Sequence, residues 1–126
     1  MKLLKLSIPA AAMAVMGVLA GSAMAADTIK IGEINHYKRM AAFANPYKQG
    51  IELGLEEINA AGGVLGKPLE FIFRDDQGKP GEAVKIAEEL MTREGAVMLT
   101  GTILSHVGLA ISSYAGKKKH LYLASE

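Results

Sequence analysis

NAAGGVLGKPLEFIFRDD, from Asn59 to Asp76, is the stretch that decides the fold of this 126-residue chain. Two adjacent glycines precede a lysine and a proline, and an apolar run then ends in two aspartates. A phosphate-binding loop would need a glycine and a hydroxyl residue at the positions held by Ala61 and Pro68, and it would lead from a strand into a helix. The glycines are better explained as a helix end, with Gly62 in the left-handed conformation, and the proline as the entry to a strand.

Strand and helix patterns alternate along the rest of the chain from residue 28 onward. Apolar runs predict four strands, at 28–34, 69–74, 96–100 and 120–124. Helical spacing predicts three helices: one with Asn45 as N-cap and Pro46 as first residue, one opening at Pro80, and one over 104–114. Short connections in a β-α-β-α-β-α-β order favour an α/β fold with a doubly wound parallel sheet.

The same patterns predict which side chains are buried. In the first helix Ile51, Leu55 and Ile58 form an apolar stripe, and Asn59 faces away from it. The strand at 96–100 is continuously apolar, which is expected of a parallel strand that is covered on both faces.

Residues 1–25 have the pattern of a signal peptide. A short basic start leads into an uncharged apolar run, and Ala23-Met24-Ala25 supplies the small residues of a cleavage site. We expect cleavage after Ala25, export to the periplasm and a mature domain of residues 26–126, with an uncleaved membrane anchor as the alternative. The formal net charge of +1 offers no basic surface for nucleic acid, and the absence of cysteine excludes disulfides and thiolate chemistry.

One connection is a candidate binding segment, because ligands of doubly wound sheets bind beyond the carboxyl ends of the strands. Gly101 to Ser105 leaves the third strand and enters the third helix at that edge. Its backbone N–H groups and the helix dipole favour an anion such as a carboxylate, and the hydroxyls of Thr102 and Ser105 can donate to the same group. An ordinary N-cap explains these hydroxyls equally well, so both interpretations stay open.

Asp75 and Asp76 end the second strand at the same edge. They are expected to cap and order the turn that follows; a Mg²⁺ site is the alternative, which would need further oxygen ligands. His36, His106 and His120 are not spaced as a metal cluster on one element, although the first two fall on the binding edge. We therefore expect no metal, no cofactor and no catalytic residue.

Three longer stretches resemble a known family. They are IKIGEI at 29–34, GIELGLEEINAAGGVLGKPLEFIFRDDQGKPGEAVKIAEEL at 50–90, and VMLTGTILSHVGLAISSYAGKKKHLYLAS at 97–125. These stretches are similar to the type I periplasmic solute-binding proteins of ABC importers, in the Leu/Ile/Val-binding group. The resemblance implies two α/β lobes that close on a ligand and present it to a permease. It covers only the first part of the first lobe, so we expect a fragment of a longer protein.

The resemblance also implies site residues. The family's carboxylate-binding serine, four positions after the glycine that ends the third strand, matches Ser105. An aromatic residue after the first strand lines the family's pocket, and here it is Phe43 or Tyr37, depending on where a gap is placed. Small residues and a hydroxyl after the fourth strand clasp the family's ligand, and this chain has Ser125 and Glu126 there.

The function implied is that of an extracytoplasmic solute-binding component without chemistry of its own. Its partners would be a small-molecule ligand and the ABC permease subunits in the inner membrane. The loop NHYKRMAAFAN at 35–45 and the sequence Ala124-Ser125-Glu126 after the fourth strand both depart from the family pattern. These departures leave a branched-chain amino acid, another amino acid, an amide and an aromatic acid open. The alternatives are a sensory receptor module and an enzyme of receiver or hydrolase type, which would rest on Asp75, Asp76 and Ser105.

Overall fold

The computed structural model describes residues 27–125, and its strands and helices alternate as the sequence predicts. Its elements are β1 (Ile29–Asn35), α1 (Ala41–Ala60), β2 (Leu69–Asp75), α2 (Pro80–Thr92), β3 (Ala96–Gly101), α3 (Ser105–Lys118) and β4 (Leu121–Ala124). The strands pair in parallel in the order β2-β1-β3-β4. The predicted parallel α/β sheet is confirmed.

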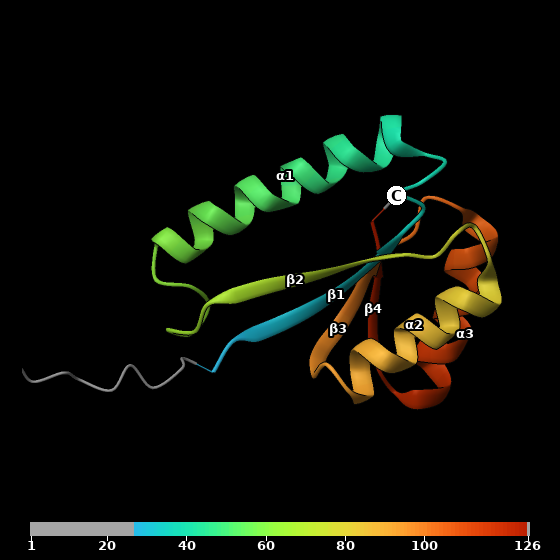
Figure 1. Ribbon diagram of the computed structural model, residues 1–126. Helices are drawn as coiled ribbons and strands as arrows, with labels where there is room; N and C mark the ends of the chain where they lie inside the picture. Colours follow the sequence, from blue (N-terminus) through green and yellow to red (C-terminus); the bar gives the residue numbers. More distant parts are fainter. Residues whose placement is uncertain (1–26, 126) are drawn as a thin grey trace, which may run out of the picture.

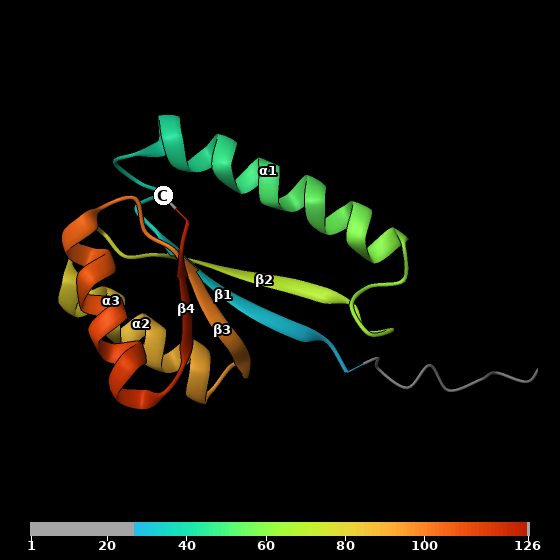
Figure 2. The same ribbon diagram turned by 180° about the vertical axis from the view of Figure 1, so that it is seen from behind.

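The helices cover the two faces of the sheet unequally. α1 lies over one face next to β2, whereas α2 and α3 lie together on the other face (Figure 1). The view from behind shows α3 beside β4 (Figure 2). The core lies between the sheet and the α2–α3 pair, and Ile34, Leu90 and Leu99 are fully buried in it. Burial of one such aliphatic side chain contributes about 1.5–3 kcal/mol.

The stretch at 59–76 forms the helix end and the strand start that its sequence predicts. Ala61 is the C-cap of α1, and Gly62 follows it with a φ of 103°. Two backbone hydrogen bonds between Val64 and Lys67, of 2.8 and 3.0 Å, then close a tight turn before β2. The structural interpretation of these glycines is confirmed.

Asn59 connects the two sides of this turn, and the prediction that it faces away is wrong. Its side-chain amide accepts a hydrogen bond from Leu69 N at 2.8 Å and donates one to Leu69 O at 2.9 Å. Asn59 therefore ties the last turn of α1 to the first residue of β2. Helical spacing cannot reveal this role, because Leu69, whose N–H and C=O groups pair with the Asn59 side chain, lies on another element.

Gly63 allows the turn to close. Its φ is 76°, and a Cβ atom at this position would lie 2.0 Å from the backbone oxygen of Lys67. Gly63→Ala is expected to lower the free energy of unfolding by about 2 kcal/mol or more, because a left-handed alanine and a backbone clash must both be accommodated. Thermal unfolding followed by circular dichroism measures the loss.

Gly66 supplies the matched control for this substitution. Its φ is 75°, but a Cβ atom there would meet nothing within 4 Å. Gly66→Ala is expected to cost only the ~1 kcal/mol of a left-handed alanine. If Gly63→Ala and Gly66→Ala lower the free energy of unfolding equally, the Lys67 carbonyl is not the reason that position 63 requires glycine.

α1 begins earlier than the sequence predicts. The predicted start at Asn45 and Pro46 is wrong, because the helix begins at Ala41 with Met40 as its N-cap and Pro46 lies inside it. Pro46 lies just beyond the first turn, where its missing N–H removes one intrahelical hydrogen bond. The alanines before Asn45 are strong helix formers and extend the helix toward β1.

Two residues predicted to be buried are exposed. Ile58, in the predicted stripe of α1, is 41% exposed, whereas Ile51 and Leu55 are half-buried. Val97 in β3 is 58% exposed, at the point where the pairing register between β1 and β3 shifts. Spacing identifies an apolar stripe, but it does not say how far along the stripe the neighbouring element reaches.

The predicted signal peptide, residues 1–25, lies outside the described residues, and its cleavage stays a prediction. The predicted mature domain, residues 26–126, is described except for its two end residues. Within residues 27–125, no helix has both the length and the apolar character needed to cross a membrane.

Candidate functional site

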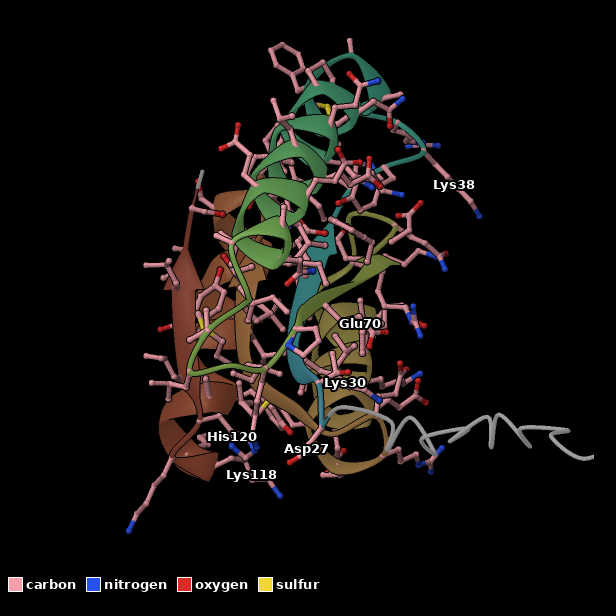
Figure 3. All side chains as sticks on the ribbon, turned by 90° about the vertical axis from the view of Figure 1, so that its left-hand side faces the viewer. Asp27, Lys30, Lys38, Glu70, Lys118 and His120 are labelled. Atoms are coloured by element: carbon pink, nitrogen blue, oxygen red, sulfur yellow. The ribbon has the colours of Figure 1, made fainter. Side chains whose placement is uncertain are left out.

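The carboxyl ends of the strands form the edge of the sheet to which the predicted binding segments belong. β1, β2 and β3 lead there into the connections from which α1, α2 and α3 begin (Figure 1). Lys38, which follows β1, lies at the opposite end of the molecule from Asp27 and His120 (Figure 3). Parallel α/β sheets bind their ligands at this carboxyl edge.

The segment after β3 is fixed to the end of the central strand. Gly101 and Thr102 have positive φ angles of 106° and 75°. Thr102 N donates to Ile34 O at 2.9 Å, and Ile103 N donates to the Asn35 side-chain oxygen at 3.2 Å. The position of this segment is therefore set by β1 rather than by α3 alone.

The N-terminus of α3 keeps hydrogen-bond donors available. Leu104 is its N-cap residue, and no side chain caps the helix. The N–H groups of Leu104, Ser105 and His106 have no hydrogen-bond partner within residues 27–125. The alternative of an ordinary side-chain N-cap is therefore wrong. Uncapped N–H groups and the positive end of the helix dipole together favour an anion.

The hydroxyl of Thr102 is engaged inside the protein. Thr102 is 3% exposed, and its Oγ1 bonds Gly101 O at 2.7 Å and the Tyr122 hydroxyl. Gly108 permits this close packing, since a Cβ atom there would lie 2.9 Å from Thr102 Oγ1. Burial raises the pKa of the Tyr122 phenol, which keeps it neutral. The exposed Ser105 is therefore the predicted hydroxyl that remains available to a ligand.

A cavity of about 450 Å³ opens beside this helix N-terminus. Its volume is within the range of small-molecule sites. Two of the predicted site residues, Thr102 and Ser105, contribute to its wall, and neither Tyr37 nor Phe43 does. The lining residues are Thr102, Ser105, Gly108, Leu109, Ser112, Tyr122 and Ala124.

Ser125 directly follows Ala124, which lines this cavity, and its hydroxyl links the end of β4 to α1. Its Oγ is 2.6 Å from the Tyr47 hydroxyl and 3.4 Å from Thr100 Oγ1. Glu126, the other residue predicted after β4, lies outside the described residues. The hydroxyl contact with Tyr47 places α1 beside the end of β4.

The two predicted aromatic residues occupy different surroundings. Tyr37 donates its hydroxyl to the fully buried Glu33 Oε2 at 2.5 Å and stands edge-on to Phe73. Phe43 is 64% exposed in the first turn of α1. Neither residue lines the cavity that Ser105 lines, and their role in binding stays a prediction.

Sequence reasoning did not identify several residues at or near this site, namely Tyr122, Gly108, Leu109, Ser112 and Tyr47. Tyr47 lies four residues after Phe43, so a correct start for α1 would have placed the two on one helix face. Tyr122 and Gly108 carry no local signal of their own, because they meet only where α3 packs beside β4.

Asp75 and Asp76 order the turn after β2, as predicted. Asp75 Oδ1 accepts a hydrogen bond from Gln77 N at 2.8 Å, and Asp76 Oδ1 accepts one from Gly78 N at 2.7 Å. Lys79 is the N-cap of α2, and no side chain caps that helix. The aspartates therefore stabilise the turn and not the helix end.

Known proteins match this chain in sequence. A family model described as periplasmic binding protein matches residues 28–125. The leucine-, isoleucine-, valine-, threonine-, and alanine-binding protein of Pseudomonas aeruginosa is 36% identical over 96 residues, which are 75% of this chain and 25% of that protein. Leu/Ile/Val-binding protein homolog 7 of Brucella suis is 32% identical over 102 residues, which are 80% of this chain and 25% of that protein.

Solved structures match the fold as well. The branched-chain amino acid transporter substrate binding protein LivJ from Streptococcus pneumoniae, in complex with isoleucine, superimposes with a TM-score of 0.70 and 30% identity. This match covers 77% of this chain and 28% of that one. The chain thus spans about a quarter of the length of the curated relatives it matches. The shared parallel sheet and the match over residues 28–125 lead to one conclusion: the chain belongs to the periplasmic binding protein family.

Proposed function

We propose that the protein is the solute-binding component of an ABC importer, which captures an amino acid or a similar small carboxylate and delivers it to the permease subunits in the inner membrane. The relatives support this class of ligand. The Pseudomonas aeruginosa protein is named for five amino acids, and the Streptococcus pneumoniae structure holds isoleucine. Export to the periplasm, with removal of residues 1–25, belongs to the same proposal.

The observation that carries the proposal is the uncapped start of α3. The free N–H groups of Leu104, Ser105 and His106 and the Ser105 hydroxyl are neutral donors at the positive end of a helix. A carboxylate accepts such bonds strongly, because bonds to a charged acceptor are roughly twice as strong as neutral ones. Binding at these donors needs neither a cofactor nor a chemical step.

The cavity suits the uncharged part of such a ligand. Leu109, which is 70% exposed, contributes an apolar side chain to the wall beyond Ser105. Ser112, Ala124 and the aromatic ring of Tyr122 complete a mixed surface around it. Contacts to Tyr37, Phe43, Ser125 and Glu126 remain predicted contributions to the same site.

Ser105→Ala tests this site in the complete protein, including any sequence that follows Glu126. Loss of one hydrogen bond to a charged carboxylate is expected to cost about 1.5–3 kcal/mol, which corresponds to a rise in Kd of about tenfold to a hundredfold. A thermal-shift screen over amino acids and related carboxylates identifies the ligand. Isothermal titration with that ligand then measures the change in Kd.

Ser113→Ala is the matched control. Ser113 is an exposed serine of the same helix and does not line the cavity. Its replacement is expected to leave both Kd and the melting temperature unchanged. If Ser105→Ala binds as tightly as the unmodified protein, or if no carboxylate raises the melting temperature, the carboxylate does not sit at the start of α3.

A further inference from the structure

His36, Asp75 and Asp76 meet at the carboxyl edge of the sheet although they come from two separate connections. Asn35 of β1 pairs with Asp75 of β2. His36 follows Asn35 and Asp76 follows Asp75, so the pairing brings His36 close to both aspartates. One ligand-type atom from each of His36, Asp75 and Asp76 lies within 4.8 Å of the other two. From the sequence, a Mg²⁺ site at Asp75 and Asp76 is only the alternative to a turn cap, because further ligands cannot be identified from spacing.

Two atoms of this cluster are buried without a partner. His36 is 6% exposed and Asp76 is fully buried. His36 Nδ1 and Asp76 Oδ2 have no hydrogen-bond partner among residues 27–125. An orphaned buried polar atom costs about 1–3 kcal/mol, and more if it is charged. Native proteins normally supply such buried atoms with a partner, and a bound ion is one partner that would satisfy both atoms.

The distances from His36 Nδ1 to the nearest oxygen of each aspartate are close to those between the ligands of one metal ion. His36 Nδ1 is 3.5 Å from Asp76 Oδ1 and 3.7 Å from Asp75 Oδ1, which is too long for a hydrogen bond. Zinc with bonds of 2.0–2.2 Å in tetrahedral geometry holds neighbouring ligand atoms about 3.3–3.6 Å apart. We propose that His36, Asp75 and Asp76 form a binding site for zinc or a similar divalent transition-metal ion.

The ligand set favours zinc over magnesium or calcium. An imidazole nitrogen suits zinc, whereas the two alkaline-earth ions take oxygen ligands. The N–H groups of Gln77 and Gly78 donate to the Oδ1 atoms of Asp75 and Asp76 and hold the carboxylates in place, as outer-shell groups do in metal sites. Burial raises the pKa of the Asp76 carboxyl, and a bound cation offsets that cost.

The residues around the cluster indicate which fourth ligand would complete the coordination of the metal ion. His36 lines a cavity of about 250 Å³ together with Lys38, Arg39, Gln77 and Lys79. Three protein ligands leave a fourth tetrahedral position for water or an anion. The basic side chains of this cavity lower the affinity for a bare cation but favour a negatively charged fourth ligand. The start of α3 lies nearby, because a Cβ atom at Gly78 would meet His36 Nε2 at 3.3 Å and Leu104 Cδ1 at 3.4 Å. The cavity that His36 lines nevertheless shares no lining residue with the cavity beside Ser105.

Titration with zinc chloride tests the site. The chain is first treated with a chelator and dialysed, and zinc is then added in isothermal titration and thermal unfolding. One zinc ion per chain and a rise in melting temperature are expected. His36→Gln and Asp75→Asn are each expected to weaken zinc binding about a hundredfold or more, because the first removes the imidazole ligand and the second replaces a charged carboxylate oxygen with a neutral amide oxygen. Magnesium chloride at the same concentration is expected not to shift the melting temperature.

His120→Gln is the control, because His120 lies at the opposite end of the molecule from Lys38 (Figure 3), and Lys38 lines the same cavity as His36. Its zinc affinity is expected to stay that of the unmodified chain. Asp75→Asn keeps an oxygen acceptor for Gln77 N, so this variant decides the question if His36→Gln does not fold. No zinc binding, or binding that survives both substitutions, would overturn the site and leave an ordinary histidine–aspartate contact.

Discussion

Gly101→Ala is expected to lower the free energy of unfolding by about 3 kcal/mol or more. Gly101 has a φ of 106°, and a Cβ atom there would lie 2.4 Å from the backbone oxygen of Ile34 and 2.7 Å from Glu33 Oε1. Both neighbours belong to the buried central strand and cannot move aside without disturbing the sheet. For a domain of this size the loss corresponds to a fall in melting temperature of roughly 12 °C or more, measured by thermal unfolding.

Gly62→Ala is the control for Gly101→Ala, because it introduces a side chain at a positive φ without a steric clash. Gly62 has nearly the same φ, 103°, but a Cβ atom there would meet nothing within 4 Å. Its replacement is expected to cost about 1–2 kcal/mol. If Gly101→Ala is no more damaging than Gly62→Ala, the close approach of β3 to the end of β1 does not restrict this position.

Leu99→Ala is expected to destabilise the protein by about 3 kcal/mol, within the range of about 2–5 kcal/mol for buried leucines. Leu99 is fully buried in the core beneath α2, and its Cδ2 would lie 2.9 Å from a Cβ atom at Gly32. This tight packing leaves the surrounding backbone little room to collapse into the cavity. Urea unfolding should show a lower midpoint with an unchanged slope.

Leu65→Ala is the control for the core substitution. Leu65 is 93% exposed in the turn before β2, so its truncation removes almost no buried surface. Its cost is expected to stay within about 0.5 kcal/mol. A Leu99→Ala variant with the same midpoint as Leu65→Ala would place the stabilising core elsewhere than between the sheet and α2.

The order of the elements could be predicted from sequence because it depends on local signals. The glycines after Asn59, the proline at the start of α2 and the apolar strands each act within a few residues. The start of α1 could not be predicted in the same way. Asn45 and Pro46 are a good start signal, but alanines further upstream also form helix, and the packing of Ala44, which is fully buried, decides between the two starts.

The candidate site was predictable only in part. Gly101 to Ser105 follows from the rule that parallel strands present their ligands at the carboxyl edge. The engagement of Thr102 by Tyr122, and the hydroxyl contact between Ser125 and Tyr47, did not follow from any pattern. These pairs join residues that are distant in sequence, and their contact depends on how the elements pack.

The sequence by itself determined the parallel α/β architecture, the turn at 59–76 and the family, because helical and strand periodicity, glycine and proline act locally along the chain. Only the tertiary structure decided which donors at the start of α3 stay free and that His36 lies against Asp75 and Asp76. Those arrangements depend on the register in which β1 pairs with β2 and β3, and this register cannot be read from the spacing of residues along the chain.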